Sequence, residues 1–201
     1  MTRRIVPVRQ GAIDGLCSVY AVLNACRLLG VAGAERVSAD AHWDQSKRLF
    51  RALCLSHETR TLFPEILCDG VGEQGLETLI AVARQWAPRH SAVSLSVRDL
   101  KPKGASPHEF FQRLRDEMRG APGERSAFIL GLAAPWDHWT VVRRVRNYDV
   151  VLFDSNVFPA RRKSTASFRS FTFDKHAPGV ATRKRHVIDA RRGFLLTSTP
   201  K

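Results

Sequence analysis

Apolar residues recur at steps of three and four positions in four stretches of this chain, which is the period of an amphipathic helix. In the first stretch the recurring residues are Val19, Val22, Leu23, Cys26 and Leu29. Helices are therefore expected over residues 17–29, from residue 35 or 38 to residue 55, over residues 73–86 and over residues 106–119.

Specific residues mark where two of these helices begin or end. Ser106, Pro107 and Glu109 form a capping box with proline at the first helical position, so the fourth helix is expected to begin there. Pro88 is expected to end the third helix, because proline lacks the backbone N–H that a helix uses. Residues 57–75 contain one proline and three glycines and are expected to be rich in loops.

Apolar and polar residues alternate with period two in the rest of the chain, which is typical of half-buried strands. Strands are expected over residues 93–97, 126–132, 139–146, 150–153, 171–173, 185–189 and 193–197. The turn at residues 147–149 joins two of them into a hairpin. Helices first and antiparallel strands later indicate an α+β fold. We expect one domain over residues 1–201, with a helical lobe over about 1–120 and a β-lobe over about 121–201.

The chain is strongly basic, and its excess charge is uneven. It has 32 Lys and Arg against 19 Asp and Glu, and residues 140–201 contribute +10 of the net +13. Such a field attracts anionic partners, which include nucleic acid, an acidic protein surface and anionic lipid. The candidate contacts are Arg161, Arg162, Lys163, Arg183, Lys184, Arg185, Arg191 and Arg192. Phe168, Phe171 and Phe173 alternate nearby, a spacing more typical of a core than of base-stacking platforms.

Composition excludes several classes of protein. No run of 18 apolar residues is present, so no membrane span is expected. The first residues carry charges without a following apolar segment, so we expect no signal peptide. The four cysteines lack the spacing of a disulfide framework and predict reduced thiols in a cytoplasmic protein. Cys54, His57 and Cys68 make only a fragment of a zinc pattern, so no metal or other cofactor is expected.

Cys17 stands at the predicted start of the first helix, directly after the turn at Asp14 and Gly15. The unsatisfied N–H groups at a helix start carry partial positive charge, which favours a thiolate over a thiol. Cys17 is therefore a candidate nucleophile, and the alternative is a small buried hydrophobe. A nucleophile also needs a base, a group that orients the base, and a donor for the oxyanion.

The predicted hairpin supplies the base and the group that orients it. His138 begins one strand and Asp154 ends the next, so the two side chains are expected to lie side by side although they are 16 positions apart. Asp154 would accept the imidazole N–H and hold the tautomer whose other nitrogen faces Cys17. Asn156 is the alternative third member, because residues 154 and 156 face the same side of an extended strand.

Gln10 lies in the loop before the first helix and is the candidate oxyanion donor, together with the backbone N–H of Cys17. The order of these motifs, Gln10, then Asp14-Gly15-Leu16-Cys17-Ser18-Val19-Tyr20-Ala21, then His138-Trp139, then Asp154, resembles the papain-like cysteine peptidase superfamily. It is most similar to the compact branches, the peptidase domains of bacteriocin-processing transporters and the josephin-type deubiquitinases. The resemblance implies a papain-like fold, with the cysteine on the central helix of the helical lobe and the histidine and acid on the β-lobe.

The residues and the resemblance together predict a cytoplasmic thiol hydrolase of amide or isopeptide bonds, with a Cys-His-Asp triad and a glutamine in the oxyanion hole. Its expected partner is a protein or peptide substrate, and the net charge favours an acidic one. Two alternatives stay open. The same residues serve a transglutaminase or acyltransferase, and the basic third of the chain would serve a nucleic-acid- or protein-binding module on a peptidase-like scaffold.

Overall fold

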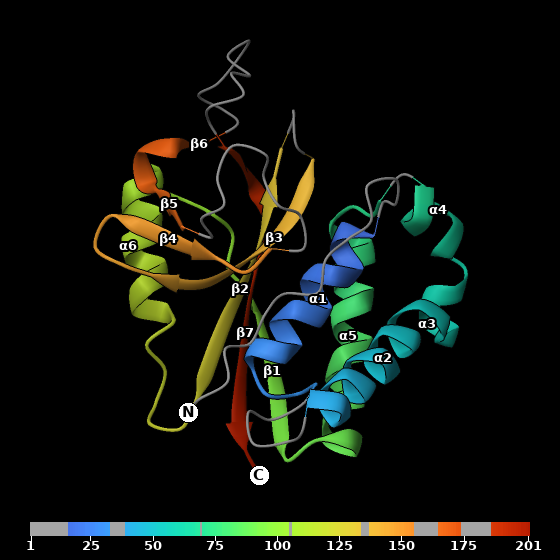
Figure 1. The fold of residues 1–201 in the computed structure, drawn as a ribbon. Helices are drawn as coiled ribbons and strands as arrows, with labels where there is room; N and C mark the ends of the chain where they lie inside the picture. The colour runs from blue at the N-terminus through green and yellow to red at the C-terminus, as the bar shows by residue number, and fades with distance from the viewer. Residues whose placement is uncertain are drawn as a thin grey trace.

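The computed structural model describes residues 16–32, 39–68, 70–104, 106–133, 137–154, 165–173 and 186–201. These residues form helices and a mostly antiparallel sheet, which confirms the predicted α+β class (Figure 1). The helices are α1 (Cys17–Leu28), α2 (Ala39–Leu55), α3 (His57–Arg60), α4 (Phe63–Cys68), α5 (Glu73–His90), α6 (Pro107–Glu117) and the 3₁₀ turn η1 (Phe168–Ser170). The strands are β1 (Val93–Asp99), β2 (Arg125–Leu132), β3 (His138–Val145), β4 (Asp149–Leu152), β5 (Thr165–Ser167), β6 (Phe171–Phe173) and β7 (His186–Pro200).

The described strands form one sheet in the order β1-β7-β2-β3-β4-β5, and β6 pairs in parallel with β7 outside this path. The other neighbours are antiparallel. The long strand β7 is central, because its second half pairs with β1 on one side and β2 on the other. The β3–β4 hairpin that was expected to carry the base is present, with Val142 opposite Leu152.

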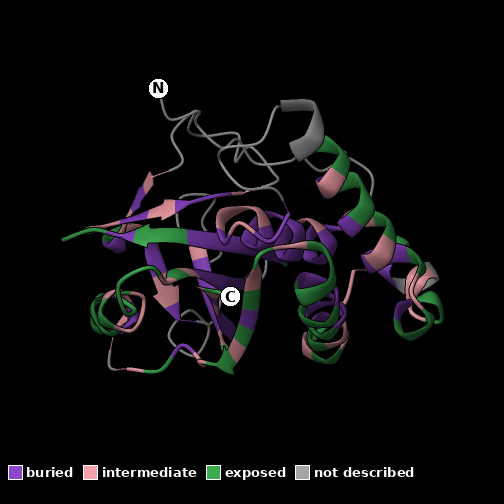
Figure 2. Ribbon diagram, turned by 90° about the horizontal axis from the view of Figure 1, so that it is seen from below, coloured by how far each residue is buried: buried purple, intermediate pink, exposed green. Residues whose placement is uncertain are grey.

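Helices cover both faces of the sheet and enclose two hydrophobic cores (Figures 1 and 2). Alternate residues of β2 belong to different cores: Ala127 and Ile129 pack with α1, α2 and α5, whereas Phe128 and Leu130 pack with α6. The period-two alternation of a strand buried on both faces produces this arrangement. The core on the α1 side holds the candidate nucleophile, and β3 contributes to both cores.

The structure confirms the four main helices and corrects three details of the prediction. Pro88 does not end α5, which continues to His90. Because proline has no N–H, the backbone carbonyl of Arg84 loses its helical partner, and Arg84 lies on the exposed side of the helix. Residues 57–75 are not mostly loop, because they contain α3 and α4. The two strands predicted over 185–197 are one strand, β7, with a register shift opposite Leu130 to Leu132.

Two elements that precede residue 120 belong to the layers around the sheet. β1 is the edge strand beside β7, and α6 buries Phe110 and Phe111 in the core on the far side from α1. Ser106 caps α6 as expected, since its hydroxyl accepts a hydrogen bond from the backbone N–H of Glu109 at 3.2 Å. Within the described parts of the chain, no helix combines the length and the hydropathy needed to cross a bilayer.

Candidate functional site

Cys17 is the first residue of α1, and its side chain is 8% exposed. The first N–H groups of a helix have no carbonyl partner within the helix, and they point past its first residue. The preceding residue, Leu16, has no side-chain acceptor that would cap them. Most of α1 is deeply buried, with Val19, Val22 and Ala25 fully covered. The sulfur of Cys17 therefore lies at the positively polarised end of a helix that the core holds in place.

His138 and Asp154 come together because the β3–β4 ladder extends past the end of β4. The backbone N–H of Phe153 donates to the carbonyl of Val141 at 2.7 Å, which continues the pairing of Val142 with Leu152. In that register Asp154 lies across from Thr140, on the same side of the hairpin as His138. A diagonal neighbour of this kind is within reach of an imidazole and a carboxylate.

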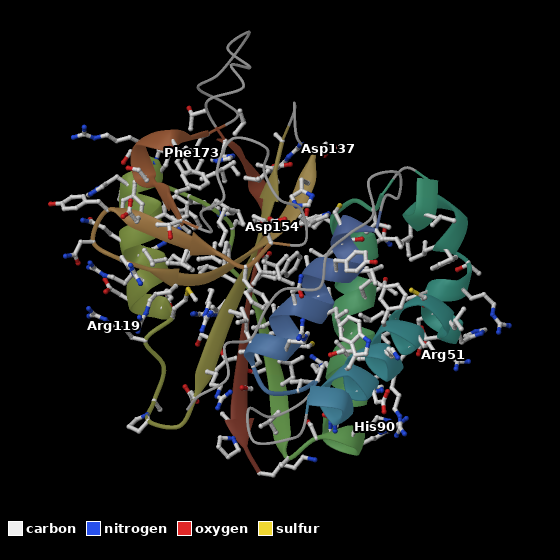
Figure 3. All side chains as sticks on the ribbon, in the orientation of Figure 1. Arg51, His90, Arg119, Asp137, Asp154 and Phe173 are labelled. Carbon is white, nitrogen blue, oxygen red and sulfur yellow. The ribbon has the colours of Figure 1, made fainter. Side chains whose placement is uncertain are left out.

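The His138 side chain contacts both of the other candidate residues. Its Nε2 is 2.9 Å from Oδ1 of Asp154, and the imidazole also forms a side-chain hydrogen bond with Cys17. The side chains of His138 and Asp154 are each 8% exposed. Figure 3 shows Asp154 at the end of β4, close to the N-terminal end of α1. The structure thus brings together Cys17, His138 and Asp154, in the order thiol, imidazole and carboxylate.

This environment favours the protonated form of His138. Burial, the largest influence, lowers the pKa of the imidazole, because it penalises a charge away from water. The hydrogen bonds and the negative charges of Asp154 and Cys17 outweigh burial and raise the pKa of His138 from 6.5 to about 10. The arrangement therefore favours a charged imidazolium beside the carboxylate of Asp154 and the sulfur of Cys17.

Two neighbours of His138 were not predicted to contribute to the site. Trp139 is buried in the core with α1, and its indole N–H donates to the carbonyl of Val71 at 3.0 Å, which ties β3 to the segment before α5. Asp137 has a φ of 35°, the only positive value among described residues other than glycine. Such a conformation costs energy, and aspartate tolerates it better than most residues. An Asp directly before the candidate histidine was the signal that could have indicated a tight turn there.

Some of the other residues that the sequence predicted to be functional lie outside the described parts of the chain. Gln10 and Asn156 lie outside these parts, as do six of the eight basic residues named as candidate contacts. Of the other two, Arg191 is exposed and binds the buried carboxylate of Asp189 at 3.2 Å. Phe168, Phe171 and Phe173 are at most 5% exposed and belong to the core, as their spacing predicted.

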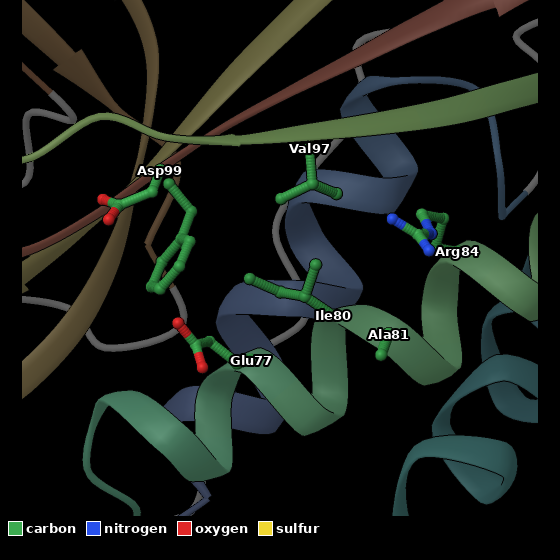
Figure 4. Close-up of a pocket in the computed structure, with 7 residues that line it drawn as sticks. Glu77, Ile80, Ala81, Arg84, Val97 and Asp99 are labelled. Atoms are coloured by element: carbon green, nitrogen blue, oxygen red, sulfur yellow. The ribbon is translucent and has the colours of Figure 1, made fainter.

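A surface pocket of about 270 Å³ lies apart from these residues, between α5, β1 and β7 (Figure 4). It has an apolar floor and a polar rim, and its lining consists of Glu77, Ile80, Ala81, Arg84, Val97, Asp99 and Phe194. None of the predicted site residues lines it, so the predicted chemistry does not lie there. Among the described residues, no three His, Cys, Asp or Glu side chains gather in a way that could hold a metal ion.

Comparisons with known proteins add one distant likeness. No family model matches the chain, and no curated protein sequence matches it. Among solved structures, the chain is similar to the avirulence protein AvrPphB of Pseudomonas, with 9% sequence identity and a TM-score of 0.44. The likeness covers 92% of this chain and 91% of that chain. A likeness of this size does not establish a family.

Proposed function

We propose that this chain is a papain-like, cysteine-dependent hydrolase of amide or isopeptide bonds. The observation that carries the proposal is the position of His138, which is hydrogen-bonded to Asp154 at 2.9 Å and also to Cys17. A thiol at a helix start, a base in contact with it and a carboxylate behind the base are the groups that thiol-dependent acyl transfer needs. The net charge of +13 supports an acidic protein or peptide as the substrate.

The proposed roles follow from the contacts. His138 takes the proton of Cys17, and the thiolate attacks the carbonyl carbon of the substrate. Asp154 holds Nε2 of the imidazole, so the other ring nitrogen, Nδ1, is directed to the sulfur. When the tetrahedral intermediate collapses, the C–N bond breaks and His138 gives its proton to the leaving amine. Water then attacks the thioester, with His138 as base, and releases the acid and the free thiol.

The oxyanion of the tetrahedral intermediate needs preorganised donors. The backbone N–H of Cys17 is one proposed donor, since it lies at the start of α1, where helical N–H groups lack internal partners. The side-chain amide of Gln10 is the second proposed donor, and it rests on the sequence pattern alone. The assignment predicts that Gln10→Ala lowers turnover by about 10²–10³-fold, which is typical for the loss of one such donor.

A first experiment measures thiolate formation without a substrate. Iodoacetamide modification of each cysteine is followed against pH by peptide mass, in the wild type and in His138→Ala. Burial raises the pKa of Cys26 to about 12 and of Cys54 to about 11, so these two thiols are internal controls that should stay unmodified near neutral pH. We expect Cys17 to react faster than Cys26 and Cys54 near neutral pH, and to lose this advantage in His138→Ala.

Equal, slow modification of all three thiols would contradict the proposed pair. Turnover is then tested on a mixture of peptides enriched in acidic residues, with Cys17→Ala as the matched inactive variant. New peptide termini that appear with the wild type and not with Cys17→Ala support hydrolysis. Cleavage that persists in Cys17→Ala contradicts the proposal. Ammonia release together with a new amide bond identifies acyl transfer to an amine, which is the alternative reaction of the same residues.

A further inference from the structure

The end of the β3–β4 hairpin farthest from His138 exposes three arginines and one tyrosine, and the adjacent turn η1 exposes a fourth arginine. We call these residues the arginine–tyrosine surface: Arg143, Arg144, Arg146, Tyr148 and Arg169. Three of the arginines lie on or directly after β3, Tyr148 lies in the turn to β4, and Arg169 lies in η1. The backbone N–H of Phe168 donates to the carbonyl of Tyr148 at 2.9 Å, which brings η1 beside the turn.

A β-bulge exposes two consecutive arginines. Strand residues alternate between faces, so only one of two neighbours is normally exposed. In β3 the register shifts between Val142 and Arg144, which inserts an extra residue opposite β4. Val142 and Val145 consequently stay buried, while Arg143 and Arg144 between them are both exposed. A bulge that re-aims side chains in this way is a structural feature of the strand, and it concentrates positive charge there.

Within the described residues, no ion pair neutralises the arginines of this surface. None of its four arginines forms an ion pair with another residue of the described chain. Arginines elsewhere do, as Arg98 pairs with Glu117 and Arg119 pairs with Asp116. Asp149, the first residue of β4, is the nearest acidic residue along the chain, and no ion pair joins its carboxylate to these arginines. Unpaired guanidinium groups in this number favour an anionic partner with several separate charges.

Tyr148 presents an aromatic ring in the turn, two residues after Arg146. It is 70% exposed, and its ring is stacked on His108 with a centroid distance of 6.2 Å and an interplanar angle of 29°. His108 in turn contacts the buried ring of Phe168 at 5.4 Å, so the stack is anchored in the core. A ring supported on one face offers its other face to a planar ligand. Exposed aromatics amid cationic groups are the elements of sequence-tolerant base stacking.

We propose that the arginine–tyrosine surface binds single-stranded nucleic acid, with phosphates on the arginines and a base stacked on Tyr148. The arginines supply sequence-independent affinity, and the aromatic ring selects for exposed bases. An acidic protein segment would form ion pairs with the arginines, but it has no planar group to stack on the exposed face of Tyr148. Duplex nucleic acid hides its base faces, so the surface is expected to prefer single strands.

The binding test uses the full chain and a fluorescein-labelled oligothymidylate of roughly 12 nucleotides. Fluorescence anisotropy is measured from about 50 to 200 mM NaCl, because phosphate contacts are identified by their salt dependence. The surface variant is Arg143→Gln/Arg144→Gln/Arg146→Gln. The matched control is Lys47→Gln/Arg48→Gln/Arg51→Gln, which removes the same formal charge from exposed positions of α2. Circular dichroism shows that each variant is folded.

The surface variant should reduce the slope of log affinity against log salt by about 2, since each phosphate contact contributes roughly 0.7 on a single strand. The α2 control should leave the slope close to that of the wild type. Tyr148→Ala should weaken binding by roughly 5- to 100-fold, while Tyr148→Phe keeps the ring and the affinity. Cys17→Ala should bind as the wild type does, so the outcome is independent of the proposed catalytic function.

Three results would overturn the proposal. Absence of binding at the lowest salt excludes a nucleic-acid site. Equal losses in the surface variant and the α2 control show that only net charge matters. Displacement of the oligonucleotide by polyglutamate of equal length, with no effect of Tyr148→Ala, identifies an acidic protein segment as the partner instead.

Discussion

Replacing Asp154 with asparagine should lower the pKa of the His138 imidazolium while leaving the site intact. Asparagine has the shape of aspartate, and its oxygen can still accept the Nε2–H bond that now measures 2.9 Å. Only the charge is lost. An opposite charge within about 4–6 Å shifts a pKa by about 1–3, and the amide oxygen still accepts a hydrogen bond, so the lower end applies and the imidazolium loses about 1.5 kcal/mol. At 1.36 kcal/mol per unit, the pKa of His138 should fall by about one unit.

The assay is an NMR titration of the imidazole C–H signals, with the His138 signal assigned by its loss in His138→Gln. The wild-type protein should titrate at about pH 10, well above the ordinary 6.5, and Asp154→Asn about one unit lower. Asp149→Asn is the matched control, because Asp149 is in the same hairpin and outside the reach of His138. Asp149→Asn should leave the pKa of His138 unchanged.

The same substitution should change the reactivity of Cys17 at alkaline pH. The thiolate–imidazolium pair exists only while His138 holds its proton, so its upper pH limit follows the pKa of His138. Asp154→Asn should move that limit down by the amount that NMR measures. The reasoning fails if the pKa of His138 stays unchanged in Asp154→Asn, or if Asp149→Asn shifts it equally, because the carboxylate at 2.9 Å would then not be stabilising the imidazolium.

Three further predictions concern stability and are measured by urea denaturation. Gly193→Ala should cost about 1–3 kcal/mol, because a Cβ there would lie 2.5 Å from a ring carbon of Phe128 and 2.7 Å from the carbonyl of Leu100; unchanged stability would mean that the sheet adjusts freely. Ser106→Ala should cost about 1 kcal/mol through loss of the α6 cap, with Ser106→Asn as the conservative control. Folding raises the pKa of His138, so its stabilisation of the fold is complete below pH 6.5 and is lost as the pH rises through about 10. The difference in unfolding free energy between wild type and His138→Gln should therefore shrink over that range. A difference that stays constant with pH contradicts this linkage.

The parts of the fold that could be predicted are those with local causes. The helix at Cys17 follows from its apolar period, and the proximity of His138 to Asp154 follows from a hairpin that joins neighbouring strands. A separation of 16 positions is short when the turn at residues 146–148 brings both strand ends together. Contact with Cys17, more than a hundred positions away, has no local cause. It was expected from the requirements of thiol chemistry and from the resemblance.

The missed details arise where tertiary context overrides local pattern. The helices α3 and α4 are short, and Thr59 and Ile66 are fully buried in them, so packing supports turns that propensity alone does not. β7 was predicted as two strands because the polar residues in its middle resemble a loop. The sheet joins the two halves, since Ile188 pairs with Leu132 and Gly193 pairs with Leu130.

The proposed site depends on how α1 docks against β3, because no single element contains it. Cys17 belongs to the helix, and His138 belongs to the strand. The docking is made by Trp139 and Val141, which are buried with α1 in one core and lie one and three positions after the histidine. The bond from Trp139 to the carbonyl of Val71 adds a third segment to this contact. A core substitution at Val141 would consequently change the distance between sulfur and imidazole as well as the stability, although Val141 touches no substrate in the proposed reaction.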